Sequence, residues 1–138
     1  SIPQFIQDYH IDNGILYGCV KHNIPFVLTG SIRDDGPLPE VYADAYQGAY
    51  AMRSLVRGAT TVICLATMLH TIAAGNMTPS FRVLPDGTVR PVYLYAVDAD
   101  EFVVNKLRDR GSLCATTMVT NVQDFITKVA RDLGVYPK

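Results

Sequence analysis

Short apolar runs alternate with segments of helical periodicity along this chain, and this alternation constrains the fold more than any other feature. Four runs have the length and the β-branched, apolar content of buried strands: residues 24–29, 60–67, 92–97 and 114–120. Helical segments are predicted at residues 4–22 (in two pieces), 40–57, 98–110 and 121–133. Because strands that alternate with helices pair in parallel through right-handed crossovers, the pattern predicts one α/β domain over residues 1–138.

Turn-forming residues mark the ends of several segments. Pro85-Asp86-Gly87 lies between β-forming residues and predicts a small β-hairpin within residues 80–90, whose second limb leads into the run at 92–97. Gly58 ends the helical segment before the second run. Asn121 is expected to cap the last helix.

Composition excludes several classes of protein. With 49% hydrophobic and 18% charged residues the chain has the composition of a soluble globular domain, and a net charge of −1 gives no basic field for nucleic acid or an anionic membrane. The apolar runs are too short to span a bilayer. Cys19, Cys64 and Cys114 are odd in number and lie far apart in apolar segments, so we expect buried free thiols, no metal knuckle and a cytoplasmic protein.

Polar residues follow the ends of the four predicted strands. Ligands of parallel α/β sheets bind beyond the carboxyl ends of the strands. At those positions the chain has Gly30 and Ser31, then His70, then Asp98, and finally Asn121. The sequence therefore predicts a binding site at this edge of the sheet.

The loop at residues 30–39 is the densest in chemically active groups. Arg33 offers a planar fork for a carboxylate or phosphate, while Asp34 and Asp35 can pair with an ammonium group or act as a base. A solvated turn in which Arg33 pairs with an aspartate explains the same residues equally well.

Other candidates also allow two interpretations. His70 suits acid–base work near neutral pH, or simply the start of a helix. Gly75 and Asn76 either end a helix or present an amide to a cofactor. Asp98 either binds a ribose hydroxyl or, with Asp100, caps the next helix. Neither G-x-G-x-x-G nor G-x-x-x-x-G-K-[ST] occurs, so a complete standard phosphate site is not encoded here.

Three blocks of sequence carry a family resemblance: IPFVLTGSIRDDGPLP at 24–39, MLHTIAAGNM at 68–77 and DRGS at 109–112. They resemble the signature sequences of the LOR/SDH bifunctional enzyme conserved domain family, and the similarity covers nearly the whole chain. That family includes archaeal-type ornithine cyclodeaminases and the carboxy-terminal part of cyanobacterial arginine dihydrolase/ornithine cyclodeaminase. The resemblance implies a three-layer, Rossmann-like parallel sheet related to deoxyhypusine synthase.

The resemblance also implies a redox-neutral lyase reaction. NAD would take a hydride from the α-carbon of ornithine, the δ-amine would attack the imine with loss of ammonia, and return of the hydride would give proline. Arg33 would hold the carboxylate, Asp34 or Asp35 would lie near the δ-ammonium, and His70 would be the acid–base group. The residues that would bind the cofactor are Gly30, Ser31, Gly75, Asn76, Asp98 and Asn121.

Three departures from the family pattern limit what the resemblance carries. Family members have an upstream glycine-rich segment that residues 1–138 lack, so we expect the carboxy-terminal portion of a longer chain. Residues 82–91 look like an insertion, and Asp98-Ala99-Asp100-Glu101 stands where Asp-Ile-Asn-Pro is usual. The expected partners are an amino-acid substrate and either the rest of that chain or a homo-oligomer. A non-catalytic module that binds NAD or an amino acid, or a purely structural piece, fits the same sequence.

Overall fold

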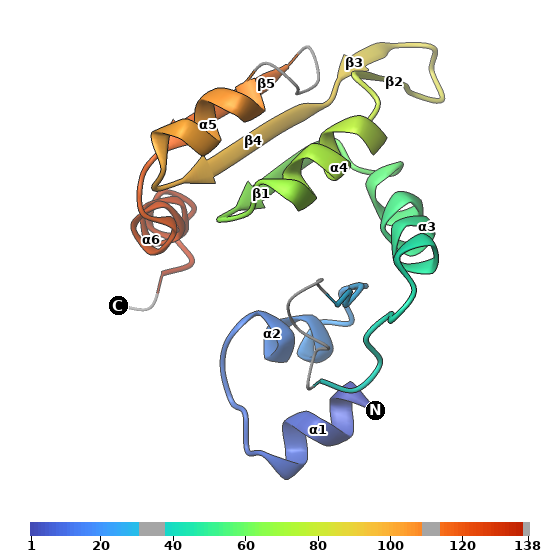
Figure 1. Cartoon of the computed structure of the whole chain (residues 1–138), viewed down its shortest axis with the longest axis vertical. Helices are drawn as coiled ribbons and strands as arrows, with labels where there is room; N and C mark the ends of the chain where they lie inside the picture. The colour runs from blue at the N-terminus through green and yellow to red at the C-terminus, as the bar shows by residue number, and fades with distance from the viewer. Residues whose placement is uncertain (31–37, 109–113, 137–138) are drawn as a thin grey trace. The chain divides into compact units, whose positions relative to one another are not determined.

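The computed structural model describes residues 1–30, 38–108 and 114–136 of the chain. These residues form two compact units, Ser1–Leu55 and Val56–Lys138 (Figure 1). In the described part of the chain, no helix has the length and apolar character needed to cross a membrane.

The first unit contains α1 (Ile2–Asp8), α2 (Ile15–Lys21) and most of α3 (Ala45–Val56). The two predicted helical pieces within residues 4–22 are confirmed, and Gly14, with φ of 94°, turns the chain into α2. Ile2 is fully buried, and its N–H donates to Glu40 Oε2 at 3.0 Å. The start of α1 is therefore tied to the segment that precedes α3.

The prediction of a buried strand at residues 24–29 is wrong. This segment is half-buried to exposed, and Thr29 forms only an isolated parallel bridge with Tyr42. Tyr42 N–H donates to Leu28 O at 2.9 Å, and Gly30 N–H donates to Tyr42 O at 3.3 Å. A short apolar run can be satisfied by local packing as well as by a sheet, and here the segment packs near Gly48 of α3.

Gly48 supplies a test of this packing. A Cβ at Gly48 would lie 2.7 Å from Thr29 Cγ2, whereas a Cβ at Gly18 of α2 would meet no atom within 4 Å. Gly18→Ala is expected to stabilise the protein by about 0.5–1 kcal/mol, the usual gain from removing a helical glycine. Gly48→Ala is expected to destabilise it by about 1–2 kcal/mol, because overpacking outweighs that gain. The measurement is denaturant unfolding of the complete protein.

A second substitution separates the clash from other effects. Thr29→Ser removes Cγ2, so the double variant with Gly48→Ala should recover most of the lost stability. If Gly48→Ala stabilised the protein as Gly18→Ala does, the close approach of α3 to Thr29 would be disproved.

The second unit is built on a parallel sheet of three strands. They are β1 (Thr61–Leu65), β4 (Tyr93–Asp98) and β5 (Ala115–Val119), in the order β1-β4-β5. In the register of the sheet Cys64 pairs with Ala96, which pairs with Thr117. The sheet confirms the predicted parallel α/β fold, although it has three strands because residues 24–29 do not join it.

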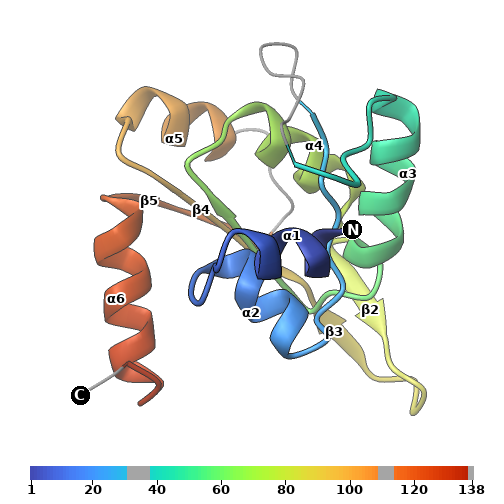
Figure 2. The ribbon, with the colours of Figure 1, turned by 90° about the horizontal axis from the view of Figure 1, so that it is seen from below.

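Helices follow each strand of this sheet: α4 (Leu69–Met77), α5 (Glu101–Arg108) and α6 (Val122–Asp132). Figure 2 shows α4 and α5 on one side of the sheet and α6 on the other. Within this unit the most deeply buried apolar side chains belong to β4, its preceding residue and α5: Val92, Leu94, Ala96, Val97, Val104 and Leu107. The central strand thus carries the core of this unit.

The predicted β-hairpin is confirmed as β2 (Phe81–Val83) and β3 (Val89–Pro91), which pair antiparallel. Gly87 adopts φ of 83°, the left-handed conformation that glycine favours in such a turn. Thr88 N–H donates to Asp86 Oδ1 at 2.9 Å, and this hydrogen bond lowers the pKa of the Asp86 carboxyl. The turn chemistry read from the sequence therefore closes the hairpin.

Candidate functional site

The carboxyl ends of the three strands meet at one edge of the sheet. Leu65 pairs with Val97, and Asp98 pairs with Val119. Two hydrogen bonds extend the pairing into the following loops: Ala66 N–H donates to Val97 O, and Thr120 N–H donates to Asp98 O, each at 2.9 Å. The loops that lead into α4, α5 and α6 therefore start side by side.

Ala66 has an unusual backbone conformation at this edge. Its φ of 52° lies in the left-handed region, which residues with a Cβ rarely occupy. Such conformations cost on the order of 1–3 kcal/mol and cluster at functional sites. The conformation of Ala66 turns the chain sharply from β1 toward α4, and Thr67 follows at once.

His70 lies exposed in the first turn of α4, as its position after the second predicted strand implied. Thr67 Oγ1 lies 3.1 Å from His70 Nδ1, within hydrogen-bond distance. The carbonyl of Thr67 accepts a hydrogen bond from Thr71 Oγ1, and Thr71 is 3% exposed. The imidazole is thus attached to a loop that is itself anchored to the interior.

Cys64 is a buried residue of β1, two positions before Ala66. Burial raises the pKa of the Cys64 thiol, and a hydrogen bond with Thr71 lowers it to a smaller extent. A buried thiol with a raised pKa is a poor nucleophile at neutral pH. All three cysteines are free, but Cys19 and Cys114 are half-buried rather than buried as expected. Cys64 therefore packs and hydrogen-bonds at the base of the site.

Asp98 and Asp100 have different structural roles at the end of β4. Asp98 Oδ1 accepts from Asp100 N–H at 2.9 Å and shapes the turn. Asp100 Oδ1 accepts from Phe102 N–H at 2.8 Å, which is the arrangement of a helix N-cap. Of the two acids considered for capping α5, Asp100 does it, and Asp98 remains a half-buried carboxylate at the carboxyl end of β4.

Asn121 caps α6 as predicted, since its Oδ1 accepts from Gln123 N–H at 2.8 Å. Gly75 and Asn76 lie in the last turn of α4, which continues to Met77. The interpretation of Gly75 as a helix end is wrong, because the helix closes at Thr78 instead. From Leu69 to Asn76 the helix rises about 10 Å, so these two residues lie away from the strand ends.

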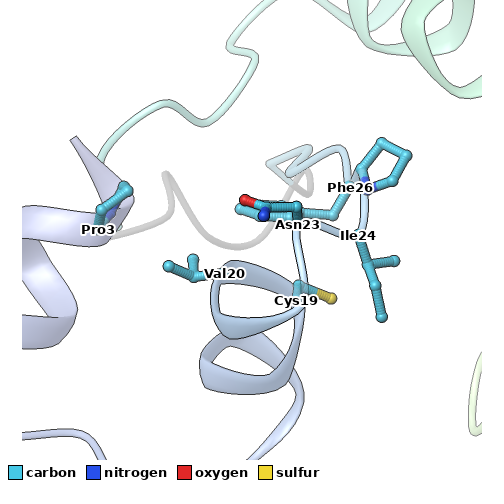
Figure 3. Close-up of a pocket in the computed structure, with 7 residues that line it drawn as sticks. Pro3, Cys19, Val20, Asn23, Ile24 and Phe26 are labelled. Atoms are coloured by element: carbon cyan, nitrogen blue, oxygen red, sulfur yellow. The ribbon is translucent and has the colours of Figure 1, made fainter.

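The remaining candidates belong to the loop after residue 29. Ser31, Arg33, Asp34 and Asp35 lie outside the described residues, and Gly30 is part of the first unit. The first unit also has an open depression of about 420 Å³ between α1, α2 and the segment that follows α2 (Figure 3). Seven residues line it, and none is charged: Pro3, Cys19, Val20, Asn23, Ile24, Pro25 and Phe26. This lining offers neither a carboxylate nor an imidazole.

His70, Asp98 and Asn121 could be placed at one edge of the sheet from the sequence. Ala66 and Thr67 were missed. The spacing of Thr67 and His70 was the available signal, because it matches the Ser/Thr-x-x-Glu/Gln spacing of a helix start with histidine in place of the acid or amide. No sequence pattern indicates a left-handed alanine.

The chain matches, over residues 1–129, the family described as "Arginine dihydrolase ArgZ-like, C-terminal, Rossmann fold". It is 46% identical over 126 residues to the ornithine cyclodeaminase of Archaeoglobus fulgidus, and this match covers 91% of the chain and 28% of that protein. It is 40% identical over 133 residues to the bifunctional arginine dihydrolase/ornithine cyclodeaminase ArgZ of Synechocystis sp., covering 96% of this chain and 17% of that protein. The chain thus spans less than a third of either relative.

Solved structures are also similar to the chain, among them these two. An LOR/SDH protein of Methanococcus maripaludis matches with a TM-score of 0.82 at 37% identity, covering 97% of this chain and 38% of that one. The ternary complex of AgrE with ornithine and NAD⁺ matches with a TM-score of 0.80 at 39% identity, covering 97% of this chain and 18% of AgrE. Both likenesses extend over nearly all of residues 1–138.

Proposed function

The chain belongs to the family of ArgZ-like carboxy-terminal Rossmann-fold domains, and on that premise we propose that the complete protein is an NAD-dependent ornithine cyclodeaminase. The observation that carries the proposal is the edge where the loops bearing His70, Asp98 and Asn121 start side by side. Relatives at 40–46% identity are named for this activity, and a similar structure contains ornithine and NAD⁺. Residues 1–138 are proposed to be the carboxy-terminal portion of that protein.

Two features of the edge fit a dinucleotide. Among the described residues no side chain caps α4, whose N-cap is Met68, so the N–H groups of its first turn suit an anionic group such as a pyrophosphate. Asp98 offers a half-buried carboxylate at the end of β4, where the acceptor for a ribose hydroxyl usually lies. We assign Asp98 to the ribose, with Gly30, Ser31 and Asn121 as further proposed cofactor contacts. Gly75 and Asn76 are not assigned, because they lie in the last turn of α4, away from the strand ends.

The proposed chemistry needs a small set of protein groups. Bound NAD supplies a hydride acceptor at the ornithine α-carbon and later returns the hydride, so no net oxidation occurs. Arg33 binds the α-carboxylate through its planar fork, and Asp34 or Asp35 holds the δ-ammonium. His70 takes the proton that the δ-ammonium must lose before its nitrogen can attack the α-carbon. Ornithine is thereby converted into proline and ammonia.

Incubation of the complete protein with ornithine and NAD tests the proposal. We expect proline and ammonia in equal amounts, without net formation of NADH. Accumulation of NADH together with a keto acid would indicate a dehydrogenase instead. Binding of both ligands without any product would favour a regulatory module.

Asp98→Ala tests the cofactor assignment. A hydrogen bond to a charged group contributes about 1–3 kcal/mol, so NAD binding should weaken by that amount in calorimetry on the complete protein. Asp100→Ala is the matched control, because Asp100 caps α5 and its loss should cost about 1 kcal/mol of stability without weakening NAD. Equal NAD affinity in wild type and Asp98→Ala would reduce Asp98 to a residue of the β4–α5 turn.

A further inference from the structure

The contact between Thr67 and His70 indicates a further role for Thr67. This role rests on the proposed acid–base function of His70. We propose that Thr67 is a positioning residue: its hydroxyl forms a hydrogen bond with Nδ1 of His70, so that Nε2 is the nitrogen that exchanges protons with the substrate. The observation is the separation of 3.1 Å between Thr67 Oγ1 and His70 Nδ1, at the edge where β1 ends.

Thr67 is held firmly enough for this task. Its carbonyl accepts a hydrogen bond from Thr71, whose side chain is buried and also hydrogen-bonds the buried Cys64 thiol. On its other side the left-handed Ala66 is fixed by the hydrogen bond from its N–H to Val97 O. Thr67 is therefore anchored both to α4 and to the central strand β4.

His70 needs such a partner because it is exposed. An exposed imidazole samples several side-chain rotamers and both neutral tautomers, and only some of these present a usable nitrogen to a substrate. A hydrogen bond at one ring nitrogen selects the orientation of the ring and decides which nitrogen carries the proton. Thr67 supplies this bond from within the same turn of chain.

A hydroxyl is suited to a group that gains and loses a proton. As an acceptor, its oxygen can receive a hydrogen bond from Nδ1–H in both the neutral and the protonated ring. When Nδ1–H donates to Thr67 Oγ1, the contact persists whether Nε2 is protonated or not. Proton exchange at Nε2 therefore does not require the ring to move.

The test compares Thr67→Val, which keeps the shape and removes the hydroxyl, with Thr67→Ser, which keeps the hydroxyl. In the complete protein Thr67→Val should lower kcat for ornithine at least about tenfold, with KM little changed. This loss is smaller than the rate factor of about 10²–10⁴ that acid–base catalysis itself supplies. Thr67→Ser should restore most of kcat. Thr116→Val, in the exposed middle of β5, is the matched control and should behave as wild type.

A spectroscopic measurement reads the contact without any turnover. Nitrogen NMR of histidine-labelled protein, with the His70 signals identified by their loss in His70→Asn, reports which ring nitrogen is protonated in the neutral state. Wild type and Thr67→Ser should show one dominant tautomer, protonated at Nδ1, and Thr67→Val should show a mixture. A purely structural role for Thr67 would not alter this distribution.

The outcomes separate the inference from the proposed function. If His70→Asn abolishes turnover while Thr67→Val keeps both wild-type kcat and the wild-type tautomer, the positioning role is overturned and the role of His70 stands. If His70→Asn turns over ornithine normally, the acid–base role fails and the positioning role falls with it.

Discussion

Replacing His70 with asparagine is expected to lower ornithine turnover at least about a hundredfold, the low end of the contribution of a general acid–base group. The amide of asparagine occupies roughly the place of Nδ1, so the contact with Thr67 Oγ1 is retained while the outer nitrogen is removed. His70 is exposed, and we expect the free energy of unfolding to change by no more than about 0.5 kcal/mol. Steady-state kinetics of the complete protein and its melting temperature together measure the effect.

His22→Asn is the matched control for this variant. His22 is exposed at the C-cap of α2 in the first unit, and it should tolerate the same substitution without loss of turnover. A folded His70→Asn protein with wild-type kcat would contradict the assignment of His70 as the acid–base group.

Asp35→Asn is expected to have an effect of similar size. The substitution is nearly isosteric and removes the charge that an ammonium partner or a base requires, so turnover should fall at least about a hundredfold. A residue of a solvated turn would tolerate the change with little effect on activity, and a surface substitution usually alters stability by no more than about 0.5 kcal/mol. Comparison of kcat and melting temperature for Asp35→Asn and Asp34→Asn identifies which carboxylate faces the δ-ammonium.

Arg33→Lys distinguishes substrate binding from catalysis within the same loop. Lysine keeps the charge and loses the bidentate fork, so the KM for ornithine should rise while kcat changes less. If Arg33→Lys and both aspartate variants turn over ornithine as wild type does, residues 30–39 carry no part of the reaction.

Local chemistry explains why much of the second unit could be predicted. The β-branched residues of β1 favour a strand, and Gly87 favours a tight turn. Both conformational preferences are set by residues that are neighbours in the sequence. The cap at Asn121 is equally local, because its partner lies two residues away. Such features need no knowledge of distant parts of the chain.

The errors occurred where a local pattern has two solutions. The run at 24–29 suits a buried strand, yet in the folded chain it forms one bridge with Tyr42 and approaches Gly48 of α3. Gly75 suits a helix end, yet α4 continues through it, because a glycine within a helix costs only about 1 kcal/mol and neighbouring contacts can compensate. In both cases packing chose between alternatives that differ little in local free energy.

The sequence by itself determined the parallel α/β class, the hairpin and the polar residues that follow the strands of the second unit. Only the tertiary structure decided that Ala66 adopts a left-handed conformation and that the Thr67 hydroxyl contacts His70. Periodicity and capping depend on residues within one or two helical turns, and these can be read along the chain. The environment of His70 depends on the hydrogen bond from Ala66 to Val97, which joins residues 31 positions apart in sequence and exists only once β1 and β4 have paired.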